Sequence, residues 1–150
     1  MNFQNPTPED IAALLARVKT IAVVGLSPRP DRPSFAVSQA MQGLGYRIVP
    51  VRPAIDVVLG EQAYARLADI PFPVDLVNVF RDSAAIPGVV AEVLAFGQIH
   101  GAPAIWIQEG IVHESAAQHA RAQGLTVVMD RCIYKDRMRL SAANLATIAP

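Results

Sequence analysis

Short apolar segments alternate along this chain with segments of helical periodicity, and this alternation constrains the fold more than any other feature. The segment Ile21-Ala22-Val23-Val24 is apolar throughout, as expected of a strand whose two faces are both covered by helices. The alternation predicts an α/β fold, a doubly wound and mostly parallel sheet with right-handed crossovers. The predicted strands are 20–24, 47–51, 75–80, 104–108 and 125–129, and the predicted helices are 33–44, 84–96 (closed by Gly97) and 114–123.

The segments outside this alternation define the expected domain organisation. Thr7 is placed to cap a helix that begins at Pro8 and carries an apolar stripe along its length. A short edge strand is expected at 57–60 and a helical turn at 63–67. We therefore divide the chain into an N-terminal helix packed on the domain (1–19), a Rossmann-like domain (20–136) and a C-terminal tail (137–150).

Charge and cysteine content exclude several function classes. Thirteen basic residues balance thirteen acidic ones, which argues against binding nucleic acid or an anionic membrane with the whole surface. We expect no membrane span, because no apolar run approaches about 18 residues. The single cysteine, Cys132, excludes an intramolecular disulfide and favours the cytoplasm.

The loop after the first strand predicts a phosphate site. It joins a strand ending at Val24 to a helix that opens at Pro33, and a helix N-terminus attracts anions through its free N–H groups and its dipole. Gly25 would let the backbone approach a phosphate, while Arg29 and Arg32 supply positive charge. The loop lacks the glycines of the G-x-G-x-x-G dinucleotide motif.

The residues that follow the other strands narrow the ligand class, because ligands of such sheets bind at the carboxyl ends of the strands. An NAD site would place an acidic residue after the second strand, whereas this chain has Arg52. A phosphorylated ribose, as in NADP or coenzyme A (CoA), is therefore favoured. Phe80 either stacks on adenine or caps the core. Cys132 is either a small buried side chain or a thiol near the ligand.

The motifs taken together resemble the small stand-alone CoA-binding proteins, whose fold is similar to the N-terminal CoA-binding domain of the succinyl-CoA synthetase alpha subunit. The resemblance covers about 20–136. It is carried by Gly25-Leu26-Ser27-Pro28, Asp31-Arg32-Pro33-Ser34, Gly45-Tyr46, Pro50-Val51, Gly60-Glu61, Asp69-Ile70-Pro71, Val74-Asp75, Phe80-Arg81, Trp106-Ile107-Gln108, Gly110 and Val128-Met129-Asp130-Arg131-Cys132.

The resemblance implies a Rossmann-like domain that binds CoA and assigns roles to individual residues. The loop from Gly25 to Ser27, with Arg32, would hold the pyrophosphate, and 51–53 would lie beside the adenosine and its 3′-phosphate. Residues 80–81 would flank the nucleotide, and 108–110 would face the pantetheine. The candidate site residues are Gly25, Leu26, Ser27, Pro28, Arg32, Ser34, Val51, Arg52, Pro53, Phe80, Arg81, Gln108 and Gly110.

The predicted function is non-catalytic binding of CoA or acyl-CoA, as a sensor or regulatory module whose protein partner is unknown. The three histidines and Trp106 are expected to play no part in catalysis or cofactor stacking, and the sequence contains no G-x-S-x-G or C-x-x-C motif. Two alternatives stay open: an NADP-dependent or acyl-CoA-processing enzyme that acts with a partner, and an interaction protein with a vestigial pocket.

Overall fold

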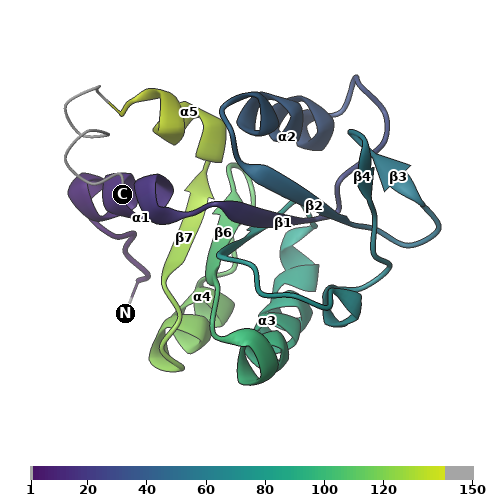
Figure 1. Ribbon diagram of the computed structural model, residues 1–150. Coiled ribbons are helices and arrows are strands. Elements are labelled where there is room, and N and C mark those ends of the chain that lie inside the picture. The colour runs from purple at the N-terminus through teal and green to yellow at the C-terminus, as the bar shows by residue number, and fades with distance from the viewer. Residues whose placement is uncertain (1, 141–150) are drawn as a thin grey trace.

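The computed structural model describes residues 2–140 and contains one five-stranded parallel sheet between two layers of helices (Figure 1). The strand order is β2-β1-β5-β6-β7, with every neighbouring pair parallel. This is the predicted doubly wound, Rossmann-like arrangement. The strands are β1 Thr20–Val24, β2 Arg47–Val51, β5 Leu76–Val79, β6 Ala104–Gln108 and β7 Val127–Arg131.

The helices cover both faces of the sheet, which explains the apolar strands. Successive residues of a strand point to opposite faces, so Ala22 packs in the core beneath α3 and α4, while Val23 packs beneath α1, α2 and α5. The helices are α1 Pro8–Arg17, α2 Pro33–Gly43, α3 Ile86–His100, α4 Glu114–Ala122 and α5 Ile133–Met138. Thr7 caps α1 as expected, since its hydroxyl accepts a hydrogen bond from the Asp10 N–H at 3.1 Å.

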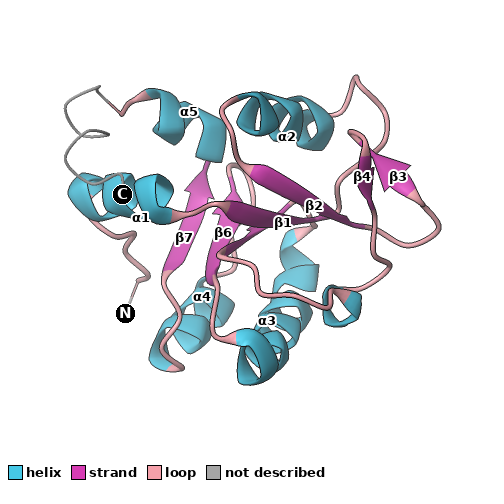
Figure 2. Cartoon of the chain, in the orientation of Figure 1, coloured by secondary structure: helices cyan, strands magenta, loops and turns pink. Residues whose placement is uncertain are grey.

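The segment between β2 and β5 departs from the sequence prediction. The strand expected at 57–60 is shorter: β3, Val57–Val58, pairs with β4, Glu61–Gln62, in a hairpin apart from the main sheet (Figure 2). The helical turn expected at 63–67 is wrong. Tyr64 instead extends alongside β2, with its N–H donating to Pro50 and its carbonyl accepting from Arg52. A 3₁₀ turn follows at Leu67–Asp69.

The predicted end of the third helix is also wrong. Gly97 lies inside α3, where the absence of a side chain permits close packing: a Cβ there would lie 3.2 Å from the Cα of Ala102. Gly101, with φ +92°, ends the helix. Residues Ser83–His100 are long and apolar enough to cross a membrane by length and composition alone, although polar residues such as Glu92 interrupt the apolar run, so the expected absence of a membrane span stays a prediction. Core helices meet the same criterion, and α3 packs its buried face on the sheet.

The C-terminal part of the described chain contains an unexpected helix. The last strand begins at Val127 and ends at Arg131, two residues later than predicted at each end. Helix α5 follows and crosses the predicted domain boundary at residue 136. Its buried Asp136 accepts two hydrogen bonds from Arg131, at 2.6 and 2.7 Å, and pairs with Arg139. Residues 141–150 of the predicted tail lie outside the described residues.

Both edges of the sheet are covered by single residues from elsewhere in the chain. On β2, Tyr64 forms the bridge described above. On β7, the side-chain amide of Asn5 makes the two hydrogen bonds that a paired strand would make with Met129. It donates to the Met129 carbonyl at 2.9 Å and accepts from the Met129 N–H at 2.8 Å. These contacts satisfy backbone groups that an edge strand would otherwise leave open.

Candidate functional site

A crevice of about 600 Å³ lies at the carboxyl ends of β1, β2, β5 and β6. It contains most of the candidate residues that follow the strands. The predicted residues that line it are Gly25, Ser27, Arg32, Ser34, Arg52, Phe80, Arg81 and Gly110. Arg29, expected to supply positive charge, lines it as well, and the structure adds Pro33, Asp82, Ser83 and Ile111.

Gly25 holds the first two loops of the crevice close together. Its φ is +87°, and a Cβ at this position would lie 2.4 Å from the carbonyl oxygen of Phe80. The Gly25 N–H also donates to the Val51 carbonyl at 2.9 Å. Only glycine fits this close approach of the ends of β1, β2 and β5 without a backbone shift.

Hydrogen bonds within the β1–α2 loop fix its shape. The Ser34 hydroxyl accepts from the Ser27 N–H at 2.9 Å, and the Ser27 hydroxyl accepts from the Arg29 N–H at 3.1 Å. Ser27 and Ser34 are both buried. The two serines therefore shape the loop from inside, through contacts that need no ligand.

The crevice concentrates positive charge. Four arginines line it, against one carboxylate, Asp82. Arg29 pairs with Asp31 at 3.1 Å, whereas the other three have no ion pair among the described residues. Helix α2 also begins here without a side-chain cap; Pro33 has no N–H and the Phe35 and Ala36 N–H groups donate to the Arg32 carbonyl, so the helix offers an anion mainly its dipole. The unpaired arginines are Arg32, Arg52 and Arg81.

Five predicted residues do not line the crevice. Leu26 and Val51 are buried in the two halves of the core. Gln108 is also buried, and its side-chain oxygen accepts from the Ile133 N–H at 3.4 Å, so it ties β6 to α5. Pro28 and Pro53 are exposed beside the crevice loops.

Sequence reasoning missed the far wall of the crevice. Ser83 begins a 3₁₀ turn, Ser83–Ala85, before α3, and Asp82 lies at its N-cap. The Ser83 hydroxyl accepts from the Val112 N–H at 3.2 Å. This bond joins the β5–α3 and β6–α4 loops and brings Ile111 to the wall. The sequence offered one signal for these residues, namely their position: both loops follow strands whose carboxyl ends form the ligand edge of the sheet.

The other groups considered in the sequence lie away from the crevice. Trp106 is fully buried, and its ring N–H donates to the Arg131 carbonyl at 2.8 Å. Cys132 is a buried thiol outside the crevice lining. Asp75 and Asp130 lie at opposite ends of the sheet: the Asp75 carboxylate accepts from the Lys19 and Thr20 N–H groups, and the Asp130 carboxylate accepts from the Gly110 N–H at 2.7 Å.

Glu109, which follows β6, forms an ion pair with Lys135 of α5. Lys135 contacts the Glu109 carboxylate at 3.0 and 3.3 Å. The hydrogen bond and the charge of Glu109 raise the pKa of Lys135. The Glu109 side chain therefore points to α5 and does not line the crevice, whereas the neighbouring Gly110 does. Within residues 2–140 no group of three potential metal ligands comes together.

Comparison with known proteins identifies relatives that cover almost the whole chain. The model of a family described as "CoA binding domain" matches residues 19–137. An uncharacterized protein, YneT of Bacillus subtilis (strain 168), is 51% identical over 131 residues, which is 87% of this chain and 94% of that protein. A hypothetical protein from Pyrococcus horikoshii OT3 superposes with a TM-score of 0.83 at 32% identity, covering 93% of this chain and 99% of the other.

A partial match lies in a larger enzyme. The acetate–CoA ligase [ADP-forming] II of Archaeoglobus fulgidus is 32% identical to this chain over 76 residues. The match spans 49% of this chain and 11% of the ligase. The same kind of domain therefore occurs alone and as a small part of a multidomain protein.

Proposed function

Because this chain belongs to the CoA-binding domain family, we propose that it binds CoA in the crevice at the carboxyl edge and catalyses no reaction by itself. The proposal covers free CoA and acyl-CoA, which share the nucleotide part. In this proposal the protein acts as a sensor or a carrier of CoA.

The observation that carries the proposal is the convergence of unpaired arginines on an uncapped helix N-terminus. CoA bears a pyrophosphate and a 3′-phosphate, so it needs several cationic contacts at separate points. Arg32 lies at the N-cap of α2, where a pyrophosphate would also meet the helix dipole. Arg52 follows β2, the neighbouring strand, and we assign it to the 3′-phosphate.

The apolar surface of the crevice suits the remaining parts of the ligand. Phe80 is half-buried at the end of β5 and presents a ring on which adenine would stack. Ile111, in the β6–α4 loop, offers an apolar contact for the pantetheine. A volume of about 600 Å³ lies within the usual range of small-molecule sites, about 300–1,000 Å³.

The composition of the lining supports a binding role without chemistry. Among the described lining residues there is no histidine, cysteine or lysine, and Asp82 is the one carboxylate. General acid–base catalysis commonly uses a pair of titratable groups held within hydrogen-bonding reach of the substrate. The crevice holds and neutralises an anion but offers no such pair.

The test is calorimetric titration of the purified protein with CoA, dephospho-CoA, NADP and NAD. We expect CoA to bind most tightly and NAD most weakly. Arg52→Ala should weaken CoA by about 1–3 kcal/mol, because a charge-assisted hydrogen bond is lost, and should barely change dephospho-CoA. Arg66→Ala, which removes an exposed arginine outside the crevice, is the matched control.

Two outcomes of this titration count against the proposal. Tight NADP binding without CoA binding would point to a redox cofactor. Equal losses for CoA and dephospho-CoA in the Arg52→Ala variant would remove the assignment of Arg52 to the 3′-phosphate, while CoA binding itself would stand.

The similarity to part of the acetate–CoA ligase favours a second candidate, a CoA-binding component of an enzyme completed by a partner. The protein alone should then still release no CoA from acetyl-CoA, as in the first proposal. The two candidates differ when cell extract is added. A release of free thiol that depends on added protein, and that Arg32→Ala abolishes, would favour the enzyme component.

A further inference from the structure

Strand β7 contains one extra residue near its carboxyl end. Ile107 of β6 pairs with Met129 of β7. The next pair is Gln108 with Arg131, so Asp130 forms a bulge and has no partner on β6. The φ of Asp130 is +59°, a left-handed value that is uncommon in residues other than glycine. Strained backbone of this kind clusters at binding and catalytic sites.

The bulge brings the Asp130 carboxylate to the β6–α4 loop. One carboxylate oxygen accepts from the Gly110 N–H at 2.7 Å, and a hydrogen bond to a charged acceptor is stronger than one between neutral groups. Asp130 has no ion pair within residues 2–140, so no cation competes with Gly110 for the carboxylate. Gly110 lines the crevice, whereas Asp130 does not.

The contact with Asp130 fixes one side of a residue that forms the crevice wall. Ile111 lines the crevice and lies between Gly110 and Val112 in the chain. The Val112 N–H donates to the Ser83 hydroxyl at 3.2 Å, so both neighbours of Ile111 are held by side chains from outside the loop. Of these two hydrogen bonds, the one to Asp130 is shorter and has the charged acceptor.

We propose that Asp130 is a positioning residue for the ligand, and that it places Gly110 and Ile111 against the pantetheine part of CoA. This inference rests on the proposed function, in which Ile111 contacts the pantetheine. Asp130 acts through Gly110, because it does not itself line the crevice. The change should therefore affect the pantetheine and spare the nucleotide, whose phosphates are assigned to arginines of other loops.

The test compares two ligands by calorimetric titration. They are CoA and adenosine 3′-phosphate 5′-diphosphate, which is the nucleotide part of CoA without the pantetheine. Asp130→Gly removes the carboxylate, and glycine adopts the positive φ without steric cost. We expect this variant to bind CoA about tenfold more weakly and to change the affinity for the nucleotide by less than about twofold.

The conservative variant should restore binding. Asp130→Asn keeps an oxygen that can accept from the Gly110 N–H, and asparagine tolerates a left-handed φ. Its affinity for CoA should therefore lie within about threefold of that of the unmodified protein. An Asp130→Asn variant that loses as much affinity as Asp130→Gly would contradict the role given to this hydrogen bond.

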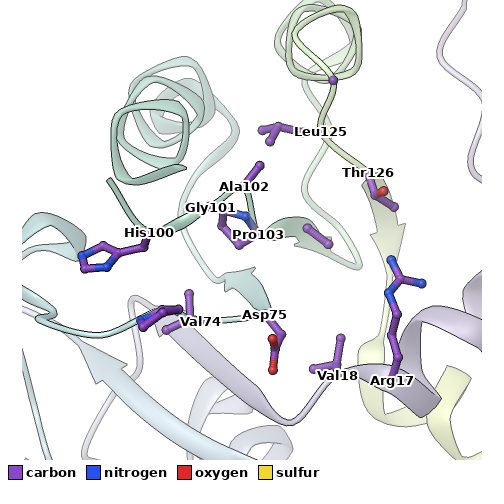
Figure 3. Close-up of a pocket in the computed structure, with 13 residues that line it drawn as sticks. Arg17, Val18, Val74, Asp75, His100, Gly101, Ala102, Pro103, Leu125 and Thr126 are labelled. Atoms are coloured by element: carbon purple, nitrogen blue, oxygen red, sulfur yellow. The ribbon is translucent and has the colours of Figure 1, made fainter. Parts of the chain in front are cut away.

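The control is a carboxylate that binds backbone N–H groups at the other end of the sheet. Asp75 lines a second pocket, of about 350 Å³, at the amino ends of the strands (Figure 3). One of its oxygens accepts from the Lys19 and Thr20 N–H groups, both at 2.9 Å. Asp75→Gly should lower the midpoint of thermal unfolding but leave the ratio of the two affinities unchanged. A general loss of stability therefore does not reproduce the expected result.

A second measurement needs no ligand. The Gly110 amide should exchange its hydrogen faster in Asp130→Gly than in the unmodified protein, because its hydrogen bond is lost. An unchanged exchange rate would overturn the proposal.

The titration separates the failure of this inference from that of the proposed function. If the unmodified protein binds CoA but Asp130→Gly changes both ligands equally, or neither, the role of Asp130 is overturned and CoA binding is not. If the unmodified protein binds no CoA, the proposed function is overturned, and the role of Asp130 with it.

Discussion

Gly25→Ala tests whether the close approach of two strand ends builds the crevice. The variant faces two costs. A residue with a Cβ at a left-handed φ is disfavoured by about 1–2 kcal/mol, and the φ here is +87°. The new Cβ would also lie 2.4 Å from the Phe80 carbonyl oxygen, so the end of β5 must move.

The second cost, the clash with the Phe80 carbonyl oxygen, is specific to the contacts of this structure. The Phe80 N–H donates to the Val24 carbonyl, and the Gly25 N–H donates to the Val51 carbonyl, both at 2.9 Å. Separating the strand ends strains both bonds, and overpacking of this kind costs about 1–3 kcal/mol. The free energy of unfolding should therefore fall by about 2–5 kcal/mol in total.

Gly45→Ala is the matched control. Gly45 has φ +101°, but no atom lies within 4 Å of the position that a Cβ would take there, so this variant bears the backbone cost alone. Equilibrium unfolding in urea measures both variants. We expect Gly25→Ala to lose more stability than Gly45→Ala, and to weaken CoA binding while Gly45→Ala does not. Equal losses of stability would show that the contact with Phe80 relaxes freely, and the reasoning would fail.

Two further predictions concern helix α3 and Tyr46. Gly88→Ala should raise the free energy of unfolding by about 0.5–1 kcal/mol, since Gly88 is an exposed helical residue with open space around it; thermal or urea unfolding that shows a loss would contradict this. Burial raises the pKa of Tyr46, whose hydroxyl donates to the Leu15 carbonyl at 2.5 Å, although the charge of Arg137 opposes the shift. The folded state therefore holds this proton more tightly than the unfolded state, so the contribution of Tyr46 to stability is complete below the unfolded pKa of about 10 and falls as the pH rises above it. Tyrosine absorbance at alkaline pH measures this: the difference between the unmodified protein and Tyr46→Phe should titrate with a midpoint above 10, and a difference with a midpoint at or below 10 would contradict the assignment.

The strands were predictable because their signal is local. Four consecutive apolar residues with one polar residue at one end are sufficient to place β1, β2 and β6 to the residue. The contacts that the prediction missed depend on distant partners. No residue near Tyr64 in the sequence indicates that its backbone will pair with β2. A glycine such as Gly97 predicts the end of a helix unless its contact with Ala102 is known.

The sequence predicted which loops form the candidate site better than it predicted which of their side chains point into it. A residue that follows a strand lies at the ligand edge, but its side chain can point to the core or to the crevice. Leu26 and Gln108 point inward, whereas Arg52 and Arg81 line the crevice. The direction depends on the turn of each loop and on partners such as the Ile133 N–H, which spacing along the sequence does not specify.

The two covered edges of the sheet limit how this molecule could polymerise. Strand-by-strand growth into a fibril needs an edge whose N–H and C=O groups are open to a second chain. Here Asn5 occupies part of one edge and Tyr64 part of the other. Deleting the few residues before α1 would uncover Met129 on β7 without touching the crevice. A truncation chosen to remove an apparently dispensable N-terminus would therefore expose a growth site, and slow aggregation on storage would be its first sign.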